Sequence, residues 1–294
     1  MRGKTLSLML AVLLAACGGP LRTPNQDQID GGGRSAPADA DVQNLVLVQQ
    51  GTLPIILTVP HGGRQAIKGI QERNIAGKPG RGVGNWGGFV KGGDPNTDIL
   101  ALRISEEIKA LTGKTPYIVM AKFERRFVDP NRPPEMALDD PMARPYYDYY
   151  HNAIRHFVDE VRVKYTTGLL IDVHGQNLNP EVVMRGTMNG RTVTRLLQRF
   201  GIPAVTGDKG IFGLLEANGL KVFPANDVPP RGTAENAGLN GGYTVSTYGS
   251  NNLRGIDAVQ MEFGTRYRRK EEVQKSGADT AKAIVGFYSA YLKN

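Results

Sequence analysis

Two histidines stand shortly after apolar segments of strand length, and each is followed directly by glycine. His61 follows residues 55–59, and His174 follows residues 169–173. A glycine leaves room for a ligand or a metal ion to approach the backbone. Neutral imidazole is a common protein ligand of zinc, and a catalytic zinc site combines three protein ligands with one open position. The pair therefore predicts a metal site that needs a third protein ligand.

Two carboxylates compete for the place of that third ligand. Asp98 stands where a loop runs into a helical pattern, a position at which an acid can instead stabilise the helix N-terminus. Glu72 lies in a polar stretch, where its alternative role is that of a solvated surface charge. The residue types and their spacing leave both candidates open.

An arginine-rich segment follows the apolar run 117–121. It contains the neighbours Arg125 and Arg126 and, five residues further on, the pair Asn131 and Arg132, which has a proline on either side. Planar guanidinium groups bind carboxylates through two hydrogen bonds, and an arginine beside a metal can stabilise a tetrahedral oxyanion. The alternative is a purely structural role, as a basic turn whose conformation is restricted by its prolines. The segment favours a substrate that bears a carboxylate.

Glu262 stands near the end of the apolar segment 258–263. A glutamate in such a strand is rarely there for stability alone. Burial raises the pKa of a carboxyl group into the range that suits a general base. Glu262 is therefore the candidate base that activates a water molecule at the metal.

The segments that must position these residues alternate between two patterns. Purely apolar runs, typical of strands buried on both faces, occur at residues 45–48, 55–59, 117–121, 169–173, 181–184 and 258–263. Helical patterns lie between them at residues 97–111, 144–165, 191–200 and 271–292. This alternation predicts an α/β domain with a mostly parallel or mixed sheet. Such sheets bind ligands at the carboxyl ends of their strands, where His61, His174 and Glu262 stand.

The N-terminus has the pattern of a bacterial lipoprotein. Residues 1–16 combine a basic start with an apolar run too short to span a bilayer, which predicts a signal peptide. Cys17 is the only cysteine and follows two small residues, so we expect it to be lipidated, as with palmitate, and to be the mature N-terminus. Residues 17–42 are predicted to be a flexible tether, and residues 43–294 the folded domain.

The charge of the chain limits the classes of partner that it is expected to bind. The net charge of +8 would fall to +6 without Arg2 and Lys4, and the basic residues are scattered. No basic stripe with interleaved aromatic residues occurs, so nucleic-acid binding is not expected. We expect the protein in the bacterial cell envelope, anchored to the membrane by its lipid. Because Gly18 is not acidic, the periplasmic face of the outer membrane is the expected place in a Gram-negative cell.

The ordered set of motifs resembles the N-formylglutamate amidohydrolase family, which looks like a remote relative of zinc carboxypeptidases and aspartoacylases. The matching segments follow the family's order across most of the folded domain and lie at residues 59–63, 97–98, 125–132, 171–176, 240–249 and 260–262. The resemblance implies a single-domain, three-layer α/β/α fold of the phosphorylase/hydrolase-like kind.

The resemblance also implies a metal site and a reaction. Its zinc ligands would be His61, Asp98 and His174, with one ion per chain. The family has an acid at the position of Asp98 and no consistent counterpart of Glu72. Glu262 falls on the catalytic carboxylate. The implied reaction is hydrolysis of an amide or formamide, in which Glu262 moves a proton to the leaving amine.

The arginine-rich segment also has implied roles. Arg125 or Arg126 falls on the oxyanion-stabilising arginine, and neighbours in an extended segment point to opposite faces, so only one can face the site. Asn131 and Arg132 fall on the pair that holds the substrate carboxylate. The implied substrate is an N-formyl or N-acyl amino acid, or a related amide that bears a carboxylate.

The expected export separates this chain from the family's cytosolic enzymes of histidine breakdown, so formylglutamate itself is not the expected physiological substrate. A metallocarboxypeptidase-like peptidase and a noncatalytic surface-binding lipoprotein are the alternatives. Residues 77–93, which are rich in glycine, and the loop at residues 223–242 have no family role. We interpret them as a lid or a wall of a different pocket.

Overall fold

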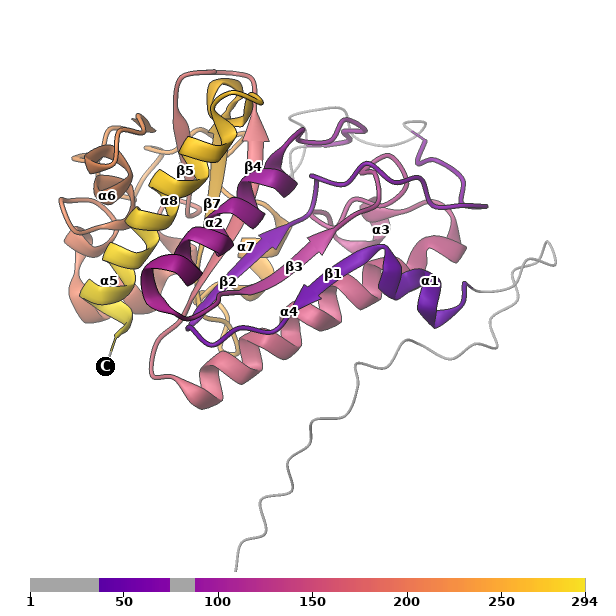
Figure 1. The fold of residues 1–294 in the computed structure, drawn as a ribbon, viewed down its shortest axis with the longest axis horizontal. Coiled ribbons are helices and arrows are strands. Elements are labelled where there is room, and N and C mark those ends of the chain that lie inside the picture. The colour runs from indigo at the N-terminus through magenta and orange to yellow at the C-terminus, as the bar shows by residue number, and fades with distance from the viewer. Residues whose placement is uncertain (1–36, 75–87, 294) are drawn as a thin grey trace, which may run out of the picture.

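A computed structural model describes residues 37–74 and 88–293 (Figure 1). The predicted signal peptide, Cys17 and most of the predicted tether lie outside these residues, as does most of the glycine-rich segment. No helix in the described ranges combines the length and the apolar character needed to cross a bilayer.

The strands of the described residues form one seven-stranded sheet with the order β1-β3-β2-β4-β7-β5-β6. Their bounds are β1 (Val46–Gln49), β2 (Ile55–Val59), β3 (Tyr117–Ala121), β4 (Leu169–Gln176), β5 (Val183–Gly186), β6 (Val222–Phe223) and β7 (Asp257–Gly264). The four adjacent strands β3, β2, β4 and β7 run parallel. Strand β1 is antiparallel to β3, and β5 is antiparallel to β7. The sheet is mixed, as the sequence predicts.

Helices cover both faces of the sheet (Figure 1). Their bounds are α1 (Asp39–Asn44), α2 (Thr97–Thr112), α3 (Pro134–Ala137), α4 (Arg144–Lys164), α5 (Thr194–Phe200), α6 (Ile211–Ala217), α7 (Tyr243–Tyr248) and α8 (Val273–Phe287). Helices α2, α5, α6 and α8 contribute to the apolar core on one face, with α2 and α8 side by side. Helices α1, α4 and α7 contribute to the core on the other. The predicted three-layer α/β/α fold is confirmed.

Simple sequence signals explain the two layers. All five residues of β2 are buried, which suits a central parallel strand. Helix α2 buries Leu100, Ile104 and Ile108 at four-residue spacing, so one apolar stripe faces the sheet. It ends at Gly113, whose φ of 69° is the left-handed conformation that glycine adopts without strain.

The folded part begins earlier than the sequence predicts. Residues 39–42 were expected in the tether, but they belong to α1, and Val42 is fully buried in the core beside α4. The predicted strand at residues 181–184 is β5, shifted by two residues. Helices α3, α6 and α7 and strand β6 were not predicted, because elements of two to seven residues are too short to show a clear period.

The loop at residues 223–242 is tied to the sheet by a buried ion pair. Glu235 accepts a hydrogen bond from Arg185 Nε on β5 at 3.0 Å. It also accepts hydrogen bonds from the backbone N–H groups of Thr187 and Asn189, each at 2.8 Å. Both charged side chains are fully buried. The ion pair therefore fixes this loop against β5 and the residues that follow it.

We expect Glu235→Ala to lower the free energy of unfolding by about 3–5 kcal/mol, because the arginine would be left buried without its counter-charge. Chemical denaturation of the metal-free protein measures this loss. The control is Glu181→Ala, which breaks an exposed pair with Arg266 and should cost less than about 1 kcal/mol. Equal losses in the two variants would contradict a structural role for the buried pair.

Candidate metal centre

The carboxyl ends of three adjacent parallel strands bring the predicted site residues together. His61 lies two residues after β2, His174 lies in β4, and Glu262 lies in β7. His174 and Glu262 are direct partners in the β4–β7 ladder. The sheet topology therefore supplies the proximity that the strand-end positions predicted.

A buried carboxylate, Asp94, completes a group that could hold a metal ion within the described part of the chain. One ligand atom from each of His61, Asp94 and His174 lies within 4.8 Å of the other two. Asp94 Oδ2 lies 3.3 Å from His61 Nδ1 and 3.1 Å from His174 Nδ1. Ligands bound tetrahedrally at zinc distances lie about 3.3 Å apart. The separations therefore suit one small cation.

The loop that carries Asp94 folds back onto the end of β2. The backbone N–H of Asp94 donates to the carbonyl of His61 at 2.9 Å, and Thr97 Oγ1 donates to the carbonyl of Asp94 at 2.8 Å. At Gly93, a Cβ would come within 2.8 Å of the His61 carbonyl, so the close approach requires glycine. The N–H of Gly175 donates to Asp94 Oδ2 at 3.1 Å. The carboxylate is thus fixed against both histidines.

The second nitrogen of each ring contacts another buried carboxylate. His61 Nε2 lies 2.7 Å from Asp129 Oδ1, and His174 Nε2 lies 2.9 Å from Asp172 Oδ2. Because a carboxylate only accepts hydrogen bonds, each Nε2 donates a proton to its aspartate in a hydrogen bond. Each Nδ1 faces Asp94 Oδ2, where a proton or a metal ion can supply the positive charge between them, and a bound metal ion would take the lone pair of each Nδ1. This is the outer-shell arrangement common around zinc-binding histidines.

The charges of the group depend on one another. Burial raises the pKa of Asp94, but His61 and His174 outweigh it and hold that pKa below its usual value. Burial lowers the pKa of His174, whereas Asp172 and Asp94 raise it, and the result is a pKa well above 6.5. In the absence of metal, a proton supplies the positive charge that the carboxylates require, so metal binding displaces it.

Glu262 is buried beside the metal group. Burial raises its pKa to about 7, with His174 opposing the rise and Asp94 adding to it. Gln260 Nε2 donates to Glu262 Oε1 at 2.8 Å and fixes that end of the carboxylate. A carboxyl group with a pKa near neutrality can both take and return a proton, as the sequence argument expected of it.

The carboxylate in the metal group differs from both candidates named from the sequence. Asp98 Oδ2 accepts from Arg64 Nη2 at 2.6 Å in the first turn of α2, and Asp98 is not part of the group. Glu72 is exposed and pairs with Lys91 at 3.1 Å. The left-handed turn at Asn96, with a φ of 65°, separates the loop from the helix. Asp94 therefore faces the histidines, and Asp98 faces an arginine.

The two neighbouring arginines have different surroundings. Arg125 is buried, and its Nε donates to Asp129 Oδ2 at 2.7 Å. Arg125 thus holds the carboxylate that contacts His61. Arg126 is half exposed and pairs with Glu72 and Glu124 at the surface. Of the pair, Arg125 is the one on the side of the metal group.

Asn131 and Arg132 border the same group. Asn131 Oδ1 accepts from the N–H of Thr244 at 2.9 Å, and its Nδ2 lies 3.2 Å from His174 Nε2. The backbone of Gly242 is so close that a Cβ there would lie 2.2 Å from Asn131 Nδ2. Arg132 is buried, and its Nη1 donates to the Asn131 carbonyl at 2.7 Å. The amide of Asn131 is therefore already engaged between β4 and α7.

Besides Arg125 and Arg132, a third buried arginine lies on this side of the site. This residue, Arg73, was not identified from the sequence. It is fully buried, and its Nη2 lies 3.7 Å from Asp129 Oδ2. Arg73, Arg125 and Arg132 each donate to a carbonyl of the segment 88–92: Val90 at 2.6 Å, Gly92 at 3.4 Å and Gly88 at 3.0 Å. Burial lowers the pKa of Arg73 to about 10. Arg73 and Arg125 thus pair with Asp129, and the charge of Arg132 also acts on it.

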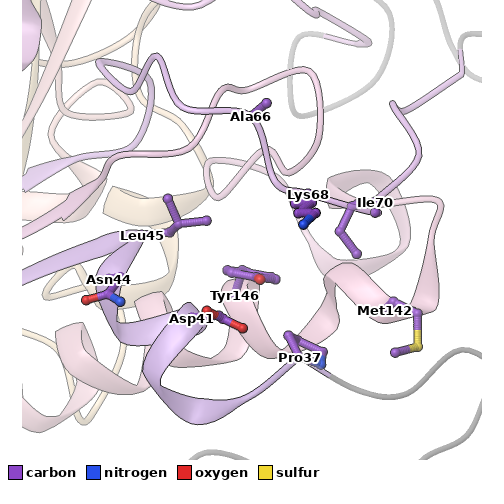
Figure 2. A pocket seen from close by; sticks show the side chains of 10 residues that line it. Pro37, Asp41, Asn44, Leu45, Ala66, Lys68, Ile70, Met142 and Tyr146 are labelled. Carbon is purple, nitrogen blue, oxygen red and sulfur yellow. The ribbon is translucent and has the colours of Figure 1, made fainter.

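A separate cavity of about 540 Å³ lies between α1, the loop at residues 66–70 and the start of α4 (Figure 2). Asp41, Lys68 and Tyr146 are among the side chains that line it. None of the residues of the metal group contributes to its lining. The cavity is therefore distinct from the metal centre.

The comparisons with known proteins agree with this architecture. No protein-family model matches the chain, and no curated protein matches its sequence. An N-formylglutamate amidohydrolase from Ralstonia eutropha is similar in structure, with a TM-score of 0.54 and 15% identity over 83% of this chain and 97% of that one. A gene product from Agrobacterium tumefaciens gives a TM-score of 0.53 and 16% identity over 86% and 98%. The chain therefore shares its fold with an N-formylglutamate amidohydrolase, in keeping with the resemblance of its motifs.

Proposed function

We propose that this protein is a zinc-dependent amidohydrolase. The observation that carries the proposal is the convergence of His61 Nδ1, His174 Nδ1 and Asp94 Oδ2 on one point, with Glu262 beside them. Three nitrogen and oxygen ligands with an open position are typical of catalytic zinc. A zinc ion held there would polarise a carbonyl group and lower the pKa of a water molecule.

The proposed reaction uses Glu262 as the proton carrier. Its carboxylate takes a proton from the attacking water and returns it to the amide nitrogen, while the carbon–nitrogen bond breaks and a carboxylic acid and an amine form. Arg125 contributes positive charge near the oxygen that gains negative charge, and its pairing with Asp129 keeps it in place. Asp129 and Asp172 hold the two imidazole rings in the orientation that presents Nδ1 to the metal.

The charge of the site supports an anionic substrate. Arg73, Arg125 and Arg132 all act on Asp129, so three positive charges lie near this one carboxylate. Guanidinium groups bind carboxylates well, and a substrate carboxylate could therefore be held beside them. Arg132 borders Asn131, which contacts His174, so an anion bound there would be close to the metal. We therefore propose an N-formyl or N-acyl amino acid, or a related carboxylate-bearing amide, as the substrate class. The name of the structural neighbour from Ralstonia eutropha supports the same class.

A panel of amides tests this function. The zinc-loaded protein is incubated with N-formyl and N-acetyl amino acids, with the same compounds carrying a primary amide in place of the carboxylate, and with short peptides. Released amine is measured. We expect the free N-acyl amino acids to react and their amidated counterparts to react at least about tenfold more slowly. Reaction of peptides alone would replace the proposal with a peptidase, and no reaction together with tight binding would replace it with a binding protein.

We further propose that the protein is exported and anchored by a lipid on Cys17. The sequence of residues 1–17 supports this, since a basic start and an apolar run precede the only cysteine. We expect labelled palmitate to be incorporated into the wild type in bacterial cells and to be absent from Cys17→Ser. Label that persists in the variant would contradict the anchor and leave the hydrolase proposal untouched.

A further inference from the structure

One guanidinium group joins three of the chain segments that form the site, those of Asp94, His174 and Glu262. Arg268 ends the short 3-10 helix η4 (Thr265–Arg268), directly after β7, and is buried. Its Nε donates to the Phe263 carbonyl at 2.9 Å, its Nη1 to the Pro95 carbonyl at 2.7 Å, and its Nη2 to the Gln176 carbonyl at 3.1 Å. Each of these carbonyls lies one or two residues from a residue of the site, namely Glu262, Asp94 and His174.

The guanidinium group of Arg268 also lies close to the backbone of Gly175 in β4. A Cβ at Gly175 would come within 2.4 Å of Arg268 Cζ. The same glycine donates its N–H to Asp94 Oδ2 at 3.1 Å. In the opposite direction, Asn96 Nδ2 donates to the carbonyl of Arg268 at 2.7 Å. The loop that carries Asp94 is therefore held to Arg268 at Pro95 and at Asn96.

A contribution to stability does not explain why an arginine is buried at position 268. Within the described residues, the hydrogen bonds of its side chain go to backbone carbonyls and no carboxylate lies within ion-pair distance, so only the more distant charges of Asp94 and Glu262 offset the cost of burial. Burying a charge in this way is costly compared with burying an apolar side chain. The charge also lies near a site that would bind a cation, which it must repel. A compensating role in the geometry of the site explains why an arginine stands here.

We propose that Arg268 is a positioning residue of the metal centre, which sets the spacing of Asp94, His174 and Glu262. This inference rests on the proposed function of the site as a zinc centre. The planar fork of an arginine donates in three directions at once. A lysine would keep the charge but has a single nitrogen, so it could not hold the same three carbonyls in one plane.

Charge and geometry predict opposite effects on metal affinity. If Arg268 acted only through its charge, Arg268→Met would remove a repulsion and tighten Zn²⁺ binding. If Arg268 positions the ligands, Arg268→Met would weaken binding although the repulsion is gone. Arg268→Lys keeps the charge and loses the three-way link, so it should weaken binding as well.

The experiment measures Zn²⁺ affinity of the complete chain by competition with a chromophoric chelator. We expect Arg268→Lys and Arg268→Met to bind Zn²⁺ about 10- to 100-fold more weakly than the wild type, the usual effect of losing an outer-shell partner. Arg266→Met is the matched control, since Arg266 lies two residues earlier, is exposed and pairs with Glu181. It should bind Zn²⁺ as the wild type does. Thermal unfolding in excess chelator checks that each variant is folded.

Wild-type affinity in Arg268→Lys, or tighter binding in Arg268→Met, would overturn the positioning role and leave the zinc site standing. A wild type that binds no Zn²⁺ would overturn both. If Arg268→Met fails to fold, Arg268→Lys and Gly175→Ala test the positioning role in its place. Gly175→Ala keeps the charge but displaces the guanidinium group, and it should also weaken binding. Unchanged affinity in either of those two variants would overturn the inference.

Discussion

We expect Asp94→Ala to abolish stoichiometric zinc binding and Asp98→Ala to retain one ion per chain. Asp94 Oδ2 is the atom that both Nδ1 nitrogens face, so its removal leaves two ligands. We expect affinity to fall by at least about 100-fold, the upper end of what the loss of an outer-shell partner costs. Metal analysis of the dialysed proteins, together with chelator competition, measures the effect.

Asp98→Ala is the matched control because it removes a carboxylate from the same loop-to-helix segment. Asp98 pairs with Arg64, which is largely exposed, so its loss should have little effect on the metal group. Glu72→Ala is a second control, because its ion pairs lie at the surface. Loss of zinc from Asp98→Ala, with retention in Asp94→Ala, would restore the ligand set that the family resemblance implies.

We expect Glu262→Gln to keep its zinc and to lose most of its hydrolytic activity. Glutamine has nearly the same size but cannot take a proton, so kcat should fall by about 10²- to 10⁴-fold, with little change in zinc affinity. In the wild type, kcat/KM should decrease as the pH falls through the pKa of Glu262. Burial sets that pKa at about 7 without metal, and a bound cation lowers it. The acid limb therefore lies at or below pH 7, and it should be absent from Glu262→Gln.

Steady-state kinetics over pH and metal analysis of the same preparations measure both properties. If Glu262→Gln lost its zinc, Glu262 would be a ligand and the base would be another residue. If the variant kept both its zinc and its kcat, proton transfer by Glu262 would be excluded.

The sequence predicts His61, His174 and Glu262 because each signal is local. Each residue stands at the end of an apolar run of strand length, and parallel strands place their carboxyl ends at one edge. The three-layer fold follows from the same alternation of strands and helices. These parts depend on short-range patterns and on one general rule of sheet topology.

Asp94 could not be chosen by the same reasoning. Asp94 lies in a loop and Asp98 in the first turn of the helix that follows it, and the choice depends on the turn at Asn96 and on the hydrogen bond from Asp94 N–H to the His61 carbonyl. Arg73 and Arg268 were missed for a related reason. Their partners are carbonyls distant in the sequence, such as Pro95 for Arg268, and no periodicity marks such contacts. The glycine and proline that flank Asp94 were the available sign that its loop approaches another segment closely.

A zinc titration of the metal-free protein, followed by the rate of hydrolysis of an N-formyl amino acid, tests the central claim most directly. We expect the rate to rise in proportion to added zinc and to stop rising at one equivalent per chain. A metal-free protein that hydrolyses the substrate at a rate that zinc does not change would contradict it.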